Sequence, residues 1–317
     1  MLRAPYLGPA TPAGYLSGSL LRTICALDPG LAGPVTHMKH GKEAHMVRRR
    51  TVAFGVACLV LAMHAYADIN EGIISAWTFD DGTARDAMGV GHGTMMGAAA
   101  IADGRHGKGV DLDGVDAFVE IPHAAEFEAQ ADAFSIAAWV FNRSARDHSG
   151  VVWKGAGMGW GPNFAFRIAL VNDPNITWGT CPPGIEGWFT CDGSVVAGEW
   201  MHVCMTADGS SVSGYVNAEL PVATAGNDAN NPSAIAAPYQ TFPEEPIEIG
   251  VGRNIGALDN GVDNYLDGIV DEVYFYDRAL TAEEVAELSE GARPNRVLAV
   301  DASGKVAVAW GDLKARP

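Results

Sequence analysis

The feature that most constrains the fold is a long series of short apolar runs, each closed by a turn signal. From residue 72 onward the runs are rich in β-branched and aromatic residues, and dipeptides such as Asp113-Gly114 and Asp208-Gly209 separate them. Many short strands at near-regular spacing indicate a sandwich or barrel of antiparallel strands. The predicted strands are 73–80, 107–113, 117–122, 134–141, 149–155, 164–171, 175–180, 199–207, 211–217, 247–252 and 266–276.

One helix is predicted over residues 282–290, near the C-terminal end. Thr281 is a suitable N-cap, and Glu284 three residues later completes a capping box. The polar segment 222–246 is predicted to be a surface loop. The tail 292–317 alternates apolar and polar residues, which is consistent with a small hairpin.

Residues 46–67 have the organisation of a secretory signal peptide. Three arginines are followed by an apolar stretch over 51–63 and by the small-residue site Ala65-Tyr66-Ala67. An uncleaved membrane anchor is the alternative. Residues 1–45 are interpreted as an over-long translation start or a disordered leader. No apolar stretch of about twenty residues follows the signal, so the mature chain is predicted to have no transmembrane helix and to be secreted or held at the cell surface.

The mature chain is strongly acidic. Residues 1–67 hold seven of the 21 basic and two of the 38 acidic residues, which leaves 14 basic and 36 acidic residues and a net charge of −22. Such a chain repels nucleic acid and anionic membranes. We therefore expect neither as a partner.

Two of the three cysteines of the mature chain frame a short loop. Cys181 and Cys191 bracket the sequence CPPGIEGWFTC, whose prolines and glycines allow its ends to meet. Exported chains can keep disulfides, so a Cys181–Cys191 bond is predicted. Cys204 lies in a strand and is predicted to be a buried free thiol.

Asp271 occupies an unexpected position in the last predicted strand. Strict alternation along 266–276 places it on one face with Ile269, Val273 and Phe275. A buried carboxylate requires a cation or several donors. Two interpretations stay open: a calcium ion, or backbone N–H groups together with an arginine such as Arg253.

Several phrases together resemble one known family. ISAWTFDDG, GKGVDLDGVDAFVEIP, FSIAAWVF, EWMHVCMTADGSSVSGYVN and LDGIVDEVYFYDRALTAEEV occur in this order over residues 72–291. They resemble the laminin-G-like, concanavalin A-like jelly-roll family of secreted bacterial proteins. The resemblance implies a domain over 68–291, with two packed antiparallel sheets and one short C-terminal helix. It also implies binding of glycans, glycoproteins or other cell-surface partners.

In such relatives a calcium ion is often held where the first strand meets the last. This implies a candidate set made of Asp271, the adjacent pair Asp80 and Asp81 after the first strand, and a carbonyl near Gly114. The spacing matches no EF-hand loop, so no motif decides between a calcium ion and the alternative partners of Asp271.

Carbohydrate binding is the leading functional prediction. Sugars stack on exposed aromatic rings, and the candidate rings are those of Trp160, Trp178, Trp188 and Phe189. The alternative for each ring is packing at a sheet rim. No paired catalytic carboxylates or nucleophile triad stand out, so the protein is predicted to be a binding module and not an enzyme. Protein–protein adhesion or a structural surface role is the alternative function.

Overall fold

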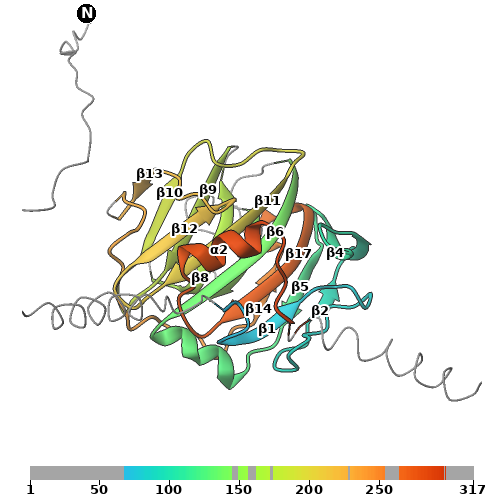
Figure 1. Ribbon diagram of the computed structural model, residues 1–317, viewed down its shortest axis with the longest axis horizontal. Coiled ribbons are helices and arrows are strands. Elements are labelled where there is room, and N and C mark those ends of the chain that lie inside the picture. Colours follow the sequence, from blue (N-terminus) through green and yellow to red (C-terminus); the bar gives the residue numbers. More distant parts are fainter. Residues whose placement is uncertain are drawn as a thin grey trace, which may run out of the picture. The chain divides into compact units, whose positions relative to one another are not determined.

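The computed structural model describes residues 68–144, 149–155, 162–171, 174–227, 229–253, 264–295 and 297. It confirms the predicted fold class, because antiparallel strands form two large sheets and one short α-helix follows the last strand (Figure 1). Every predicted strand is present. The leader 1–45, the signal segment 46–67 and the tail from 298 onward lie outside the described residues.

Sheet A contains the last strand and the first. Its order is β12 (Val212–Val216), β11 (Trp200–Ala207), β6 (Phe134–Ser144), β17 (Asp267–Tyr276), β4 (Lys108–Asp113) and β3 (Ala100–Asp103). The first strand, β1 (Ile73–Trp77), pairs with the C-terminal half of β17, and β4 pairs with its N-terminal half. The first and last strands therefore meet, as the resemblance implies.

Sheet B is built from strands between those of sheet A in the chain. Its order is β13 (Ala223–Gly226), β10 (Trp188–Cys191), β9 (Asn175–Thr180), β8 (Phe164–Val171), β7 (Ser149–Gly155), β14 (Ile247–Ile249), β5 (Phe118–Ile121) and β2 (Thr94–Met96). A small ribbon joins β15 (Val251–Gly252) to β16 (Asn264–Tyr265), and the 3-10 helix η1 spans Ala125–Ala131. The strand β13 lies inside the segment 222–246 that the sequence predicts as loop.

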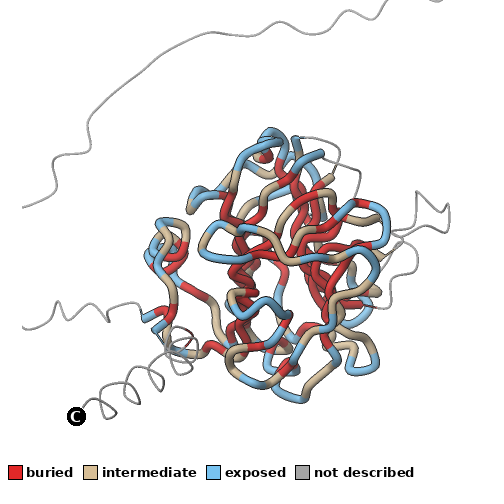
Figure 2. The backbone as a smooth tube through the Cα atoms, turned by 90° about the vertical axis from the view of Figure 1, so that its right-hand side faces the viewer, coloured by how far each residue is buried: buried red, intermediate tan, exposed pale blue. Residues whose placement is uncertain are grey.

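The main hydrophobic core lies between the two sheets. Alternate residues of each strand point into it, such as Val140 and Val270 from sheet A and Val152 and Ile168 from sheet B. Figure 2 shows these strands as buried segments surrounded by exposed loops. Side-chain alternation then assigns the remaining residues of each strand to an outer face.

The alternation in β17 is interrupted at Glu272, and this corrects the predicted position of Asp271. Glu272 has a φ of 50°, and the register with β6 shifts between Asp271 and Tyr274. This bulge adds one residue to the strand, so Val270 and Val273 both face the core. Asp271 pairs with Trp139 on the outer face of sheet A. The predicted grouping of Asp271 with Val273 and Phe275 is wrong.

The outer face of sheet A is covered by the C-terminal helix. The predicted capping box is confirmed: α2 (Ala282–Ser289) begins with Thr281 and Glu284 capping each other. Its apolar residues Val285 and Leu288 join a second core with Tyr274 and Tyr276 of β17 (Figure 1). Among the described residues, no helix is long and apolar enough to cross a membrane.

Candidate functional site

A continuous row of side chains crosses the outer face of sheet B. Strand register pairs Glu120 with Glu248, Glu248 with Trp153, Trp153 with Arg167, Arg167 with Gly179, and Gly179 with Trp188. Directly opposite residues share a face, and their chain neighbours, such as Val152 and Ile168, belong to the core. We call Glu120, Glu248, Trp153, Arg167, Gly179 and Trp188 the outer row.

Trp188 is the half-buried aromatic residue of this row. Its ring packs against a small cluster formed by Trp153, Phe164 and Cys181. Gly179 makes this packing possible, because a Cβ there would lie 3.0 Å from the Phe164 ring and 3.1 Å from the Trp188 Cβ. The backbone N–H of Trp188 donates to the side-chain oxygen of Asn227 at 2.8 Å. An aromatic surface and an exposed amide therefore lie next to each other.

Arg167 is buried beside these rings. It is 3% exposed, and its guanidinium carbon lies 4.4 Å from the ring centroid of Phe164 and 5.9 Å from that of Trp188. Cation–π contact of this kind is attractive. Burial nevertheless lowers the pKa of Arg167 to about 10.

The other end of the row is held by an ion pair. Glu248 is 2% exposed, and both of its carboxylate oxygens contact the guanidinium of Arg253, with the Nε donating at 2.7 Å. The same guanidinium lies 5.1 Å from the ring centroid of Phe118. A bidentate pair of this kind engages both carboxylate oxygens of Glu248 and fixes the orientation of the side chain.

Two of the predicted ligand-binding rings belong to the core. Trp178 and Phe189 are 0% exposed and stack on each other with centroids 5.5 Å apart. They are directly paired in register and face inward, whereas their neighbours Gly179 and Trp188 face outward. The alternation of side chains along a strand places Trp178 and Gly179 on opposite faces, but the sequence does not show which face points into the core. Trp160 lies outside the described residues.

The predicted disulfide is contradicted by the hairpin that contains it. Cys181 and Cys191 are both buried free cysteines. In the β9–β10 pairing Cys191 lies opposite Ile176, five residues before Cys181, which is about 16 Å along a strand. A disulfide requires Cα atoms about 4.4–6.8 Å apart. The loop does turn back on itself, but the strand register places Cys191 opposite Ile176 and not opposite Cys181.

Backbone N–H groups supply the hydrogen-bond partners of Asp271. Its side chain accepts from the N–H of His106 at 2.9 Å and from the N–H of Glu272 at 2.7 Å. It is 0% exposed, and burial raises its pKa to about 7. This arrangement matches the interpretation with backbone N–H groups, but the nearby arginine is not Arg253.

Arg293, beyond α2, supplies the positive charge. Its guanidinium lies 2.5 Å from a carboxylate oxygen of Glu272 and 2.7 Å from one of Asp80. The second oxygen of Asp80 accepts from the N–H of Lys108 at 2.9 Å. Asp80 and Asp271 thus bond to the same loop, and the carboxylate oxygens of both already have hydrogen-bond donors.

The remaining two predicted calcium ligands point elsewhere. Asp81 is exposed and accepts from the N–H and hydroxyl of Thr83. Gly114 follows β4, whose end pairs with Asp267, four residues from Asp271. That separation is about 13 Å along the strand. The described residues contain no group of three or more acidic, histidine or cysteine side chains placed to hold a metal. Calcium binding stays a prediction.

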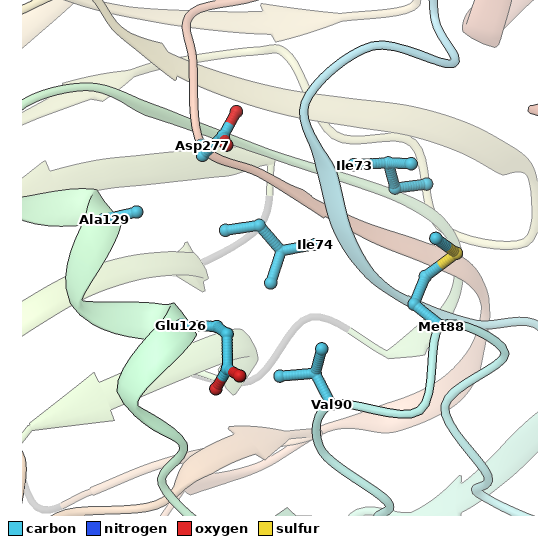
Figure 3. A pocket seen from close by; sticks show the side chains of 7 residues that line it. All are labelled: Ile73, Ile74, Met88, Val90, Glu126, Ala129 and Asp277. Carbon is cyan, nitrogen blue, oxygen red and sulfur yellow. The ribbon is translucent and has the colours of Figure 1, made fainter.

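A groove lies beside the first strand. Figure 3 shows the seven residues that line it: Ile73, Ile74, Met88, Val90, Glu126, Ala129 and Asp277. Its volume is about 410 Å³. These lining residues include no aromatic ring on which a sugar could stack, so the outer row is the better candidate for a ligand.

A family model for the concanavalin A-like lectin/glucanase superfamily matches residues 113–286, more than half of the chain. The matched segment includes β5 to β17, and so both sheets. The protein belongs to the concanavalin A-like lectin/glucanase superfamily. No curated protein sequence matches the chain.

Solved structures show the same fold at low identity. Domain 4 of AbnA, an extracellular arabinanase from Geobacillus stearothermophilus, in complex with arabinotriose, is 22% identical, with 68% of this chain and 98% of that chain covered and a TM-score of 0.49. The binding domain of botulinum neurotoxin DC with SialylT is 14% identical, with 70% and 52% covered and a TM-score of 0.51. The same toxin domain with rat synaptotagmin II is 12% identical, with equal coverage and TM-score. The superfamily member described here therefore spans about half of each toxin chain.

Of the outer row, the sequence predicted only Trp188 as a site residue. The other members, Glu120, Trp153, Arg167, Gly179 and Glu248, and the adjacent Phe164 all lie in predicted strands, but only as strand residues. A signal was present for one of them: FAFRIALV carries a single charged residue in an apolar strand, the same kind of exception that drew attention to Asp271.

Proposed function

We propose that the protein is a non-catalytic carbohydrate-binding module whose ligand lies on the outer row of sheet B. The observation that carries the proposal is Trp188, a half-buried ring on the outer face of a sheet with polar groups next to it. Sugars bind proteins through one ring face stacked on an aromatic side chain and hydroxyls fixed by nearby polar groups. Asn227, bonded to the Trp188 backbone, is one such group.

Sugar binding by this fold has a precedent among the structural relatives. The toxin binding domain found in complex with SialylT shares the fold at 14% identity. At that identity the shared property is the fold, so the position of any ligand on the present chain is inferred from its own residues.

The carboxyls support binding without catalysis. Glycosidases need a protonated acid near the scissile bond as well as a second carboxylate. On the outer row, Glu248 is ion-paired through both oxygens to Arg253. Among the carboxyls of the described residues, Asp271 and Glu272 have a pKa clearly raised by burial, and both belong to sheet A. We also propose export through the segment 46–67, which lies outside the described residues.

The test is glycan binding by the full chain and two tryptophan variants. Trp188→Ala removes the proposed platform, and we expect affinity to fall roughly tenfold or more, the usual consequence of losing a stacking ring. Trp200→Ala is the matched control, because Trp200 is also half-buried and packs on one ring, that of Phe141, but lies on sheet A. Equal losses in both variants, or no glycan bound by the wild type, would overturn the proposal.

Adhesion to a protein is the second candidate. The toxin domain in complex with rat synaptotagmin II has the same fold. On the present chain the apolar side chains of Ile185, shortly before β10, and Val222, directly before β13, are 60% and 81% exposed. The measurement that separates the two is binding to cells before and after enzymatic removal of their glycans. Binding that survives deglycosylation favours adhesion, and binding that is lost favours carbohydrate recognition.

A further inference from the structure

Arg167 differs from the other partly buried arginines of the described sheets and their flanking segments. Four arginines with side chains 18–36% exposed each contact a carboxylate: Arg143 with Asp111 and Asp267, Arg253 with Glu248, Arg278 with Glu284, and Arg293 with Asp80 and Glu272. Arg167 is more buried than any of these, at 3% exposure. Within the described part of the chain it has neither an ion pair nor a hydrogen bond, and its Nε is buried without a partner.

The nearest candidate anions do not compensate this charge. Cys181 lies close enough to affect the pKa of Arg167, but burial raises the thiol's own pKa to about 11, so it is neutral. Glu186 also raises the pKa of Arg167, yet forms no ion pair with it among the described contacts. In a chain with 38 acidic residues, the most buried of the described arginines has no ion pair with a described carboxylate.

Stacking on Phe164 offsets only part of the cost of burying this cation. The attraction of a cation–π contact is smaller than the favourable hydration that an ion loses on burial. The remaining donors of the guanidinium form a planar fork that matches an oxyanion. A negatively charged group beside the guanidinium of Arg167 would accept hydrogen bonds from these donors and neutralise the buried charge.

The position of Arg167 links this missing charge to the proposed ligand site. It occupies the outer row two strands from Trp188, with the side-chain-free Gly179 between them. Its guanidinium is 5.9 Å from the Trp188 ring centroid. Trp188 is half-buried, whereas Trp153 and Phe164 are each 1% exposed, so a ligand would reach the guanidinium past the Trp188 ring.

We infer that the saccharide recognised on the outer row carries an oxyanion, a carboxylate or a sulfate, which pairs with the guanidinium of Arg167. This inference rests on the proposed function, because it specifies the chemistry of the sugar bound beside Trp188. It predicts selection for acidic over neutral saccharides by a protein whose overall charge would disfavour them.

The test uses three oligosaccharide probes of equal length: an oligogalactoside, the corresponding oligogalacturonide and a sulfated oligogalactoside. Affinities are measured by calorimetry for the full chain and for Arg167→Gln, Arg167→Lys and the exposed control Arg85→Gln. We expect the wild type to prefer at least one acidic probe by roughly tenfold, because a charge-assisted hydrogen bond is stronger than a neutral one. Arg167→Gln should lose that preference, whereas the control Arg85→Gln should keep it.

The outcomes separate the two levels of the proposal. Equal affinity of the wild type for neutral and acidic probes overturns the role of Arg167 and leaves carbohydrate binding standing. Binding of none of the probes, with no signal on a wider glycan array, overturns the proposed function itself. If Arg167→Gln does not fold, Arg167→Lys decides: it retains the charge but loses the fork, so we expect an intermediate preference. An unchanged preference in Arg167→Lys and Arg167→Gln contradicts the inference.

Discussion

Single buried charges determine much of what this chain can do. Asp271, Glu272, Arg167 and Glu248 are each at most 3% exposed, and each interrupts an otherwise apolar or aromatic strand. Asp271 and Glu248 are stabilised by donors from the protein itself. Arg167 is stabilised only by rings. The difference points to a structural role for the first two and to a ligand-dependent role for the third.

The buried pair Asp271 and Glu272 should make stability depend on pH. Burial raises their pKa values to about 7 and about 8, above the ordinary values of 3.8 and 4.5. Between these limits the folded state holds protons that the unfolded state has lost. Their contribution to stability is therefore complete below about pH 4 and is lost as the pH rises through 7 and 8.

Asp271→Asn removes one of the two titrations, so the loss of stability with rising pH should be smaller than in the wild type. The measurement is the urea midpoint at intervals between pH 4 and pH 9. The difference between the two proteins is the quantity to compare, because buried His202, whose pKa is lowered to about 3, acts on both below pH 6.5. Parallel curves for the two proteins would show that Asp271 does not titrate in this window.

At the scale of elements, the hydrophobic pattern predicted the strands well and their faces less well. Long strands with β-branched or aromatic content, such as β6 and β17, were identified from sequence. The strands missed were β2, β3, β10, β13 and β16, which have two to four residues each and are too short to show alternation. The bulge at Glu272 could not be predicted, because nothing in the sequence DGIVDEVYFY marks a non-glycine residue for a positive φ.

The β9–β10 hairpin illustrates the same limit at the candidate site. Sequence identified Trp178, Trp188 and Phe189 as one aromatic group, but only one of them reaches the outer face. Residues that are close in the sequence can be predicted as one group, but the strand register decides which of them share a surface.

The hairpin also gives a prediction about redox conditions. Since Cys181 and Cys191 face different clusters and are separated in register, a reducing agent should leave the melting temperature unchanged. The check is thermal unfolding with and without dithiothreitol, together with thiol counting in the unfolded protein. A drop in melting temperature on reduction, with two fewer free thiols beforehand, would contradict the observed pairing of β9 with β10.

At the scale of the whole domain, the first strand, the last strand and the segment after the helix are connected. Arg293 contacts Asp80, which follows β1, and Glu272 in β17. Val297 is buried in the same hydrophobic cluster as the apolar residues of α2. The residues that pack on the sandwich therefore continue beyond position 291, the limit of the family resemblance.

Removing this connection should weaken the fold. At pH 9, above the raised pKa of Glu272, Arg293→Ala leaves the carboxylate of Glu272, with a side chain 1% exposed, without its cation, and the loss of one partner of a buried pair costs about 3 kcal/mol. Lys108→Ala is the matched control, because the Lys108–Asp103 pair is exposed and such pairs contribute less than about 1 kcal/mol. Urea unfolding of both variants measures the difference, and equal destabilisation would contradict the role of Arg293.

The central claim is that the outer row of sheet B, and not sheet A or the groove beside β1, receives the ligand. The most direct measurement is the set of indole N–H signals in a ¹H–¹⁵N spectrum, recorded while an oligosaccharide is titrated into the labelled protein. We predict that the signals of Trp188 and Trp153 shift with ligand, while those of Trp139 and Trp200 on sheet A stay in place. Shifts confined to Trp139 and Trp200, with Trp188 unchanged, would contradict the account.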